Sequence, residues 1–263
     1  TSIGEDAFSG CSSLASITIP TSVTSIGNYA FEGCSSLASI TIPTGVTSIG
    51  NYAFWECSSL ASIVIPAGVT SIGDWAFNNC DNLTSVYYLG DIAGWCGISG
   101  LEYLMSNGPA LYINGAKVEG EVVIPAGVET IPAYAFYKQT GITSFTIPDS
   151  VTSIGSYAFD GCSGLTSITI PDSVTSIGNS AFYGCNSIIY AEYSNDIGVS
   201  FDKSKLQTLV LSGSGEVSGF QYLEELREVI LKGNFTSIEE YAFYGCSSLA
   251  SITIPDSVTS IGV

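Results

Sequence analysis

The stretch that decides the fold is residues 11–31, CSSLASITIPTSVTSIGNYAF, which recurs along most of the chain. With one glycine before the next cysteine it forms a unit of 23 residues. Repetition at a fixed period of about 20 to 50 residues is typical of solenoids, in which each unit packs only on its neighbours. Repetition therefore predicts the architecture, and the length of 263 residues indicates how many units stack.

Each unit predicts one coil of the solenoid. Residues 17–19 (Ile-Thr-Ile) alternate apolar and polar side chains, as a strand with one buried face does. Pro20 ends the strand, because proline has no N–H to donate to a ladder. Gly27 offers a position that is free to take positive φ, and residues 28–31 are predicted to form a single helical turn. Gly33 suits a left-handed residue that closes this turn.

The regular pattern is interrupted at residues 90–121, where we expect an inserted loop and hairpin. Asn114-Gly115 stands there between apolar flanks, which is a strong hairpin signal. After Cys185 two coils are shorter and lack the Ala-Phe turn. Strands are predicted near residues 17, 40, 63, 86, 122, 145, 168, 191, 209, 229 and 252.

The eight cysteines do not predict a disulfide framework, because seven of them share one position of the repeat. A ladder with rungs about 4.8 Å apart would point the side chains in parallel rather than at each other. We expect buried free thiols that act as small hydrophobic groups. Cys96 lies outside the ladder and is the cysteine that we suspect of reactivity. The seven ladder positions are Cys11, Cys34, Cys57, Cys80, Cys162, Cys185 and Cys246.

The charge and the absence of histidine exclude several functions. The net charge is −18 with six Lys or Arg, which opposes binding to nucleic acid or anionic lipid. No apolar run approaches the roughly 18 to 20 residues that span a bilayer, so we expect no membrane insertion of this segment. Without histidine a histidine-dependent catalytic triad cannot form, and without histidine or paired CxxC motifs we expect no zinc site. We expect no metal, no cofactor and no enzyme activity.

The unit C-x-x-L-x-x-I-x-I-P-x-x-V-x-x-I-G-x-x-A-F-x-G closely resembles the BspA-like, or Treponema-type, leucine-rich repeat. The match covers nearly the whole chain. We therefore expect one leucine-rich-repeat solenoid over residues 1–263. It would be a right-handed coil of about eleven rungs, with a parallel β-sheet on its concave face and short helical or extended turns on its convex face. The resemblance implies a bacterial or protist protein that is secreted or exposed on the cell surface, and family members are associated with adhesion.

Candidate binding residues are predicted where the outward ladder changes. Regular strands present Ser and Thr outward, which can simply satisfy an exposed sheet face. Bulkier or charged residues replace these hydroxyls at some positions, either through drift of the repeat or because aromatic anchors and charges form an interface. Trp55 and Trp95 break their columns and are expected to be better candidates for exposed contact. The candidate binding residues are Tyr87, Trp95, Tyr190, Glu192, Val210, Glu228 and Ile230.

Three functions remain open at this point. The first is a non-catalytic extracellular module that binds host or microbial surface proteins through the concave sheet and the irregular repeats. The second is a structural spacer that self-associates head to tail through uncapped end strands, since the chain begins and ends inside a repeat. The third is carbohydrate binding. The column Tyr29, Tyr52, Trp75, Tyr134, Tyr157 and Tyr241 is expected to pack ring on ring rather than to bind sugar.

Overall fold

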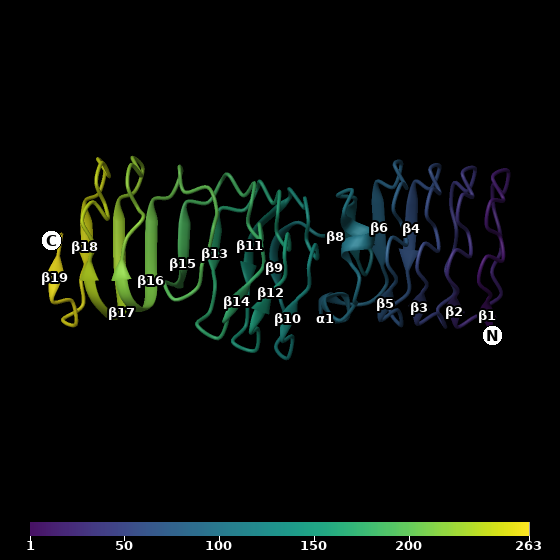
Figure 1. Cartoon of the computed structure of the whole chain (residues 1–263), viewed down its shortest axis with the longest axis horizontal. Helices are drawn as coiled ribbons and strands as arrows, with labels where there is room; N and C mark the ends of the chain where they lie inside the picture. The colour runs from purple at the N-terminus through teal and green to yellow at the C-terminus, as the bar shows by residue number, and fades with distance from the viewer. Residues whose placement is uncertain (263) are drawn as a thin grey trace. The chain divides into compact units, whose positions relative to one another are not determined.

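The computed structural model of the protein describes residues 1–262. Contacts divide the chain into two compact units. Unit 1 comprises Thr1–Val118 and Ile131–Gln139, and unit 2 comprises Glu119–Thr130 and the chain from Thr140 onward. Each unit is a parallel β-solenoid in which the strands of successive coils lie side by side (Figure 1), and the chain makes about eleven turns in all.

Unit 1 contains two sheets. The first is parallel and joins the Ser-Ile pairs of successive coils, with Ser25 opposite Ser2 and Ser48 opposite Ser25. From the second coil on, these pairs follow the prolines and lie outside the predicted strands. Its strands are β1 (Ser2–Ile3), β2 (Ser25–Ile26), β3 (Ser48–Ile49) and β5 (Ser71–Ile72). The second sheet comprises β4 (Ser62–Ile65), β6 (Ser85–Tyr88), β7 (Ala110–Ile113) and β8 (Ala116–Lys117).

The strands predicted near residues 17 and 40 are wrong in this unit. The first of these segments has no strand pairing, and the second makes only an isolated bridge from Thr41 to Val64. Ile19, Ile40 and Ile42 are nevertheless buried, so the prediction that these side chains point inward is confirmed. Burial of the isoleucines therefore does not require a regular hydrogen-bonded ladder.

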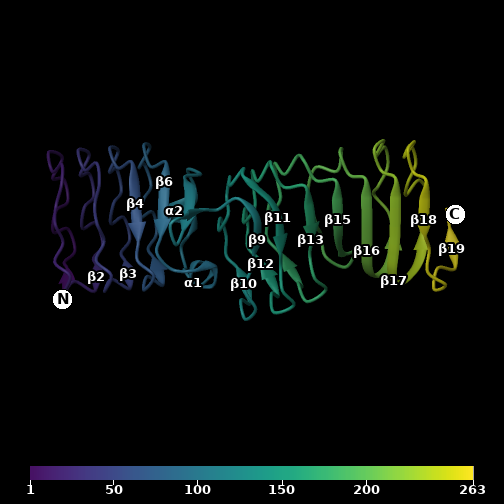
Figure 2. The same ribbon diagram turned by 180° about the vertical axis from the view of Figure 1, so that it is seen from behind.

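The insertion forms a coil of its own rather than a loop on the surface. It contains α1 (Ile92–Cys96) and α2 (Glu102–Met105), both labelled in Figure 2, and then β7, which pairs in parallel with β6. The Asn114-Gly115 turn joins β7 to the antiparallel strand β8, and both turn residues have positive φ. This is the two-residue hairpin that the Asn-Gly pair predicts.

Unit 2 is built around an eight-stranded sheet. In chain order its strands are β9 (Gly120–Val123), β11 (Ile142–Thr146), β13 (Ser167–Thr169), β15 (Tyr190–Ser194), β16 (Thr208–Val217), β17 (Glu228–Ile238), β18 (Ser251–Thr253) and β19 (Ser260–Ile261). Strands β12 (Ser153–Ile154) and β14 (Ser176–Ile177) form the second ladder, together with β10 (Thr130–Ile131), whose first residue belongs to this unit.

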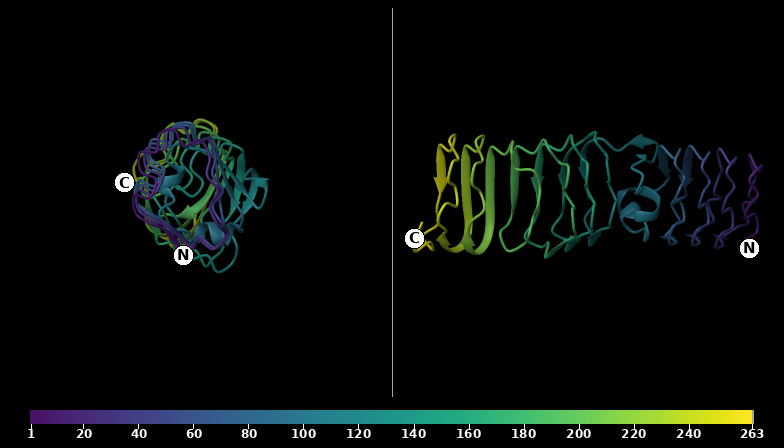
Figure 3. Two further views of the ribbon diagram at one scale, coloured as in Figure 1. Left: turned by 90° about the vertical axis from the view of Figure 1, so that its right-hand side faces the viewer. Right: turned by 45° about the horizontal axis from the view of Figure 1, so that its top comes forward.

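Strands β16 and β17 are long because their coils lack the proline that ends the regular strand. They have 10 and 11 residues and remain paired around the corner of the coil (Figure 3). At this corner Gly213 has a φ of 100°. Gly233 packs so closely that an added Cβ would lie 2.2 Å from the Gly213 carbonyl oxygen. Two glycines thus replace the proline turn of the regular coils.

The core consists of residues stacked at equivalent positions of the repeat. In unit 1 the rings of Phe8, Phe31, Phe54 and Phe77 stack with centroids 5.1–5.2 Å apart. Beside them the Cys57 thiol donates a hydrogen bond to the Phe31 carbonyl at 3.2 Å, and other ladder cysteines make the equivalent bond. All eight cysteines are free thiols, as expected. Five ladder cysteines are buried, whereas Cys11 is exposed and Cys246 is half-buried.

Two expectations about the turns were wrong. Gly27 does not adopt positive φ; an added Cβ would instead lie 2.8 Å from the Gly4 carbonyl carbon, so close approach of the coils requires glycine. Residues 28–31 form no helical turn, because Tyr29 lies in the left-handed region with a φ of 55°. Every member of the aromatic column shares this geometry: Tyr29, Tyr52, Trp75, Tyr134, Tyr157 and Tyr241.

Candidate functional site

Across three neighbouring strands of unit 2, larger or charged side chains replace some of the small hydroxyl side chains that point outward from the sheet. On β13 the outward residues are Ser167 and Thr169, which follow the regular pattern. On β15 the residue in register with Ser167 is Tyr190, and the residue in register with Thr169 is Glu192. On β17 the corresponding residues are Glu228 and Ile230. We call the outward surface of β15, β16 and β17 the β15–β17 face.

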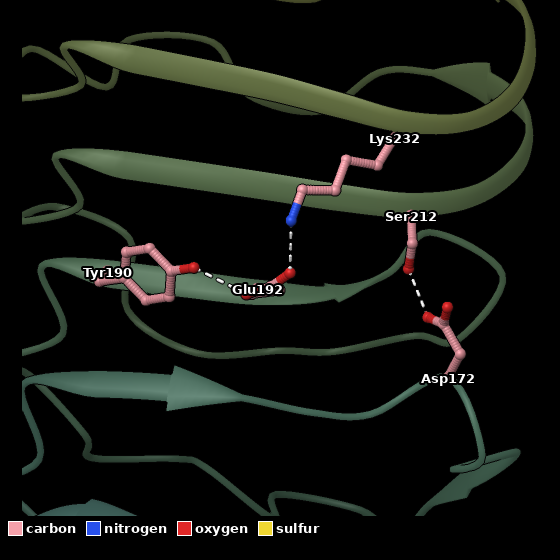
Figure 4. Close-up of polar contacts among 5 residues, drawn as sticks. All are labelled: Asp172, Tyr190, Glu192, Ser212 and Lys232. Carbon is pink, nitrogen blue, oxygen red and sulfur yellow. Dashed lines mark hydrogen bonds and ion pairs between the residues drawn. The ribbon is translucent and has the colours of Figure 1, made fainter. Parts of the chain in front are cut away.

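An ion pair crosses the β15–β17 face. The Lys232 ammonium on β17 lies 2.8 Å from Glu192 Oε1 on β15, so the pair spans β16 (Figure 4). The Tyr190 hydroxyl donates a 2.7 Å hydrogen bond to Glu192 Oε2. Glu192 is thereby held by one partner on each of its carboxylate oxygens, which fixes the orientation of its side chain.

These contacts shift two pKa values in opposite directions. The hydrogen bond from Lys232 is the main reason why the pKa of Glu192 is lowered. Burial, followed by the hydrogen bond to the Glu192 carboxylate, raises the pKa of Tyr190 to about 12. At neutral pH the carboxyl is therefore ionised and the phenol is neutral. The cluster presents fixed charges and one hydrogen-bond donor that is already in use.

A second polar contact borders a hollow beside the ion pair. The Ser212 hydroxyl on β16 donates to the Asp172 carboxylate, which belongs to the turn after β13 (Figure 4). The hollow has a volume of about 570 Å³, and its lining includes Asp149, Asp172, Glu192 and Lys232. A concave surface of mixed charge with an apolar component thus lies at the edge of the β15–β17 face.

Five of the seven predicted site residues come together here, but one of them is not exposed. Val210 lies on β16 between Glu192 and Ile230 and is only 2 % exposed, so its prediction as an outward contact was wrong. The ion pair between Glu192 and Lys232 crosses β16, the strand that carries Val210. Tyr190, Glu192 and Ile230 are half-buried, and Glu228 is exposed.

The other two predicted site residues, Tyr87 and Trp95, belong to unit 1 and are no part of this face. Tyr87 is half-buried and stacks on Tyr112 of β7 at 4.6 Å. Trp95 was expected to be exposed, and this was wrong, because it is fully buried in α1. Its indole N–H donates a 2.9 Å hydrogen bond to the Ala135 carbonyl, so Trp95 fills the core of the inserted coil.

The suspected reactivity of Cys96 is also contradicted. Burial raises the pKa of the Cys96 thiol to about 12, whereas a reactive cysteine needs a lowered pKa. Sequence reasoning overlooked Lys232, Asp172 and Ser212 as members of the site. Lys232 could have been noticed, because it is one of only six basic residues in an acidic chain.

The β15–β17 face presents a paired carboxylate and ammonium, a phenol and the exposed carboxylate of Glu228. Glu192 is held ionised and paired, so it is poorly suited to act as a general acid. Within residues 1–262, no group of three or more His, Cys, Asp or Glu side chains converges to hold a metal ion. The described part of the chain also has no helix of the length and apolarity that crossing a membrane requires.

Comparison with known proteins identifies the repeat. The family model described as "BspA type Leucine rich repeat region" matches six copies, over residues 1–94, 119–217 and 216–263. The chain belongs to the BspA-type leucine-rich repeat family. Residues 95–118, which the BspA-type model does not match, are most of the inserted coil.

Two solved structures are similar to this BspA-type chain. A leucine-rich repeat protein from Bacteroides ovatus is 28 % identical over all of this chain and 78 % of its own, with a TM-score of 0.64. A leucine-rich repeat protein from Eubacterium ventriosum is 23 % identical over 94 % of this chain and 81 % of its own, with a TM-score of 0.51, and this likeness concerns the fold alone. None of the curated proteins compared with the chain matches it.

Proposed function

We propose that this chain is a non-catalytic recognition module that binds a protein ligand outside the cell or at the cell surface. The resemblance to BspA-like repeats supports the location. The β15–β17 face supports the binding site, together with Tyr87 as a further contact in unit 1.

The observation that carries the proposal is the replacement of hydroxyl groups by Tyr190, Glu192, Glu228 and Ile230 on strands in register. Aromatic and charged side chains are typical of binding interfaces, where rings anchor the partner and charges orient it. Parallel strands hold these side chains at fixed spacing, so the face needs little ordering when a partner binds. The adjoining hollow gives the partner a concave feature to fill.

The experiment restores the regular ladder on this face. A quadruple variant, Tyr190→Ser, Glu192→Thr, Glu228→Ser and Ile230→Thr, places at these positions the residues that regular coils carry. Fluorescently labelled wild-type and variant protein are compared by flow cytometry on intact epithelial cells and on bacterial cells, and by surface plasmon resonance on purified surface proteins. We expect the wild type to bind at least one of these surfaces and the variant to lose at least about tenfold in affinity.

A matched variant controls for general effects on the fold. Val64→Thr with Val123→Thr makes the same kind of change at outward strand positions that are not proposed contacts. This control should bind as the wild type does. Equal binding by the wild type and the quadruple variant, with unchanged circular dichroism, would refute the site.

A further inference from the structure

A second hollow lies in unit 1, at the inserted coil. Its volume is about 250 Å³, and aromatic rings and polar groups line it together. The lining residues are Trp75, Asn78, Glu102, Tyr103, Ser106 and Tyr134. It is separate from the β15–β17 face, which belongs to unit 2.

The insertion leaves the Trp75 ring accessible. At the start of the aromatic column the rings of Tyr29 and Tyr52 stack, with centroids 4.9 Å apart and an interplanar angle of 5°. Trp75 occupies the next position of this column, but the coil that follows is the insertion. The ring that it meets there is Tyr103 of α2, at 6.1 Å and tilted by 46°. Trp75 remains 48 % exposed, so part of its indole face is open to solvent.

The second ring lies beside a carboxylate. The pKa of Tyr103 is raised, first by burial and then by the carboxylate of Asp74, which is the residue before Trp75. Tyr103 of α2 thus lies next to the turn that carries Trp75, and the planes of the two rings enclose an angle of 46°.

Polar groups complete the lining on the same side. Asn78, Glu102 and Ser106 supply an amide, a carboxylate and a hydroxyl beside the rings. Ligand sites generally combine an apolar surface with a few polar groups that fix orientation. Aromatic rings beside amide, carboxylate and hydroxyl groups match a molecule that has an apolar face of C–H groups and a rim of hydroxyls.

We infer that this hollow binds a single ring of a neutral saccharide, with one face of the pyranose on Trp75 and its hydroxyls toward Asn78, Glu102 and Ser106. The slightly positive C–H groups of the sugar face suit the negative face of the indole ring. The volume lies just below the range of about 300–1,000 Å³ that is usual for drug-sized ligands, which fits one ring. Glu102 and the adjacent Asp74 carry negative charge and disfavour an acidic sugar.

The test uses the whole chain and simple glycosides. The protein is titrated by calorimetry with the methyl glycosides of glucose, galactose, mannose and N-acetylglucosamine, and with N-acetylneuraminic acid as the anionic comparison. We expect a dissociation constant on the order of millimolar for at least one neutral glycoside, and weaker binding of the anionic sugar. Fluorescence should change on binding, since Trp75 lines the hollow, whereas Trp95 is fully buried and Trp55 is half-buried and is not part of the lining.

Two variants assign the binding to the hollow. Trp75→Ala should weaken the neutral glycoside at least about tenfold, whereas Tyr241→Ala should leave its affinity unchanged. Tyr241 is the matched control because it occupies the same column and is 59 % exposed, but it belongs to unit 2. Absence of binding by all the neutral glycosides, or equal binding by Trp75→Ala and the wild type, would overturn the inference. Preference for the anionic sugar would overturn the assignment to neutral saccharides.

Discussion

Replacement of Phe54 by alanine should remove the centre of the ring column in unit 1. Phe54 is fully buried between Phe31 at 5.2 Å and Phe77 at 5.1 Å, with interplanar angles of 6° and 13°. Truncation of a buried phenylalanine to alanine typically costs about 3–5 kcal/mol. We expect a loss near the upper end, about 4–5 kcal/mol, because hydrogen bonds between coils keep the neighbouring rings from closing the cavity.

The assay is urea unfolding followed by far-ultraviolet circular dichroism, with two comparison variants. Phe54→Leu keeps most of the volume and should lose only about 1–2 kcal/mol. Phe8→Ala should lose about half as much as Phe54→Ala, because Phe8 is half-buried and its ring stacks on Phe31 alone. Equal losses for Phe8→Ala and Phe54→Ala, or a loss below about 2 kcal/mol at Phe54, would refute the view of the rings as one continuous core.

Three further predictions concern close approach, pH and thiol chemistry. Gly50→Ala should destabilise the protein by about 1–3 kcal/mol, because its Cβ would lie 2.6 Å from backbone atoms of the preceding coil. Gly68→Ala should change stability by less than about 1 kcal/mol, since its nearest neighbours are 3.6 Å away; equal effects of these two variants in urea unfolding would contradict the steric argument. Glu192→Gln should lower the free energy of unfolding at neutral pH by up to about 1 kcal/mol, a value kept small by the exposure of the pair. The folded-state pKa of Glu192 is lowered, so the stability difference between wild type and Glu192→Gln should be present above the ordinary glutamate pKa. It should fade as the pH falls through the folded-state pKa of Glu192. A stability difference that persists at low pH would show another cause. Cys11 should react with a thiol reagent in the native protein at pH 8, while Cys80, whose pKa burial raises to about 12, should react only after denaturation; counting the modified thiols by mass spectrometry checks this.

The periodic part of the fold could be predicted because each unit repeats the same pattern of apolar residues, proline and glycine. Residues 17–19 showed which side chains point inward, and the shared position of seven cysteines predicted a ladder of free thiols. The period did not reveal why Gly27 must be glycine, since the reason is a contact with the preceding coil. It also did not distinguish a helical turn from a turn with left-handed residues, because tyrosine is an unusual choice at positive φ.

The insertion and the candidate site were harder to predict, because they depend on contacts that no period encodes. Trp95 was expected at the surface, yet it donates a hydrogen bond to Ala135, 40 residues along the chain. Strand alternation predicted the register of Val210 with Glu192 and Ile230, but not that its side chain is only 2 % exposed. Alternation predicts the direction of a side chain and leaves open what its neighbours place over it.

The contacts that cross a strand also have a mechanical consequence. Most bonds in a solenoid join one coil to the next, so the coils can detach singly from an end. The ion pair from Glu192 to Lys232 instead passes over β16, and the hydrogen bond from Ser212 to Asp172 passes over β15. These two overlapping links tie together the coils that contain β13 to β17. Under a pulling force this part of unit 2 should rupture as one block and should resist shear at the surface that it presents to a partner.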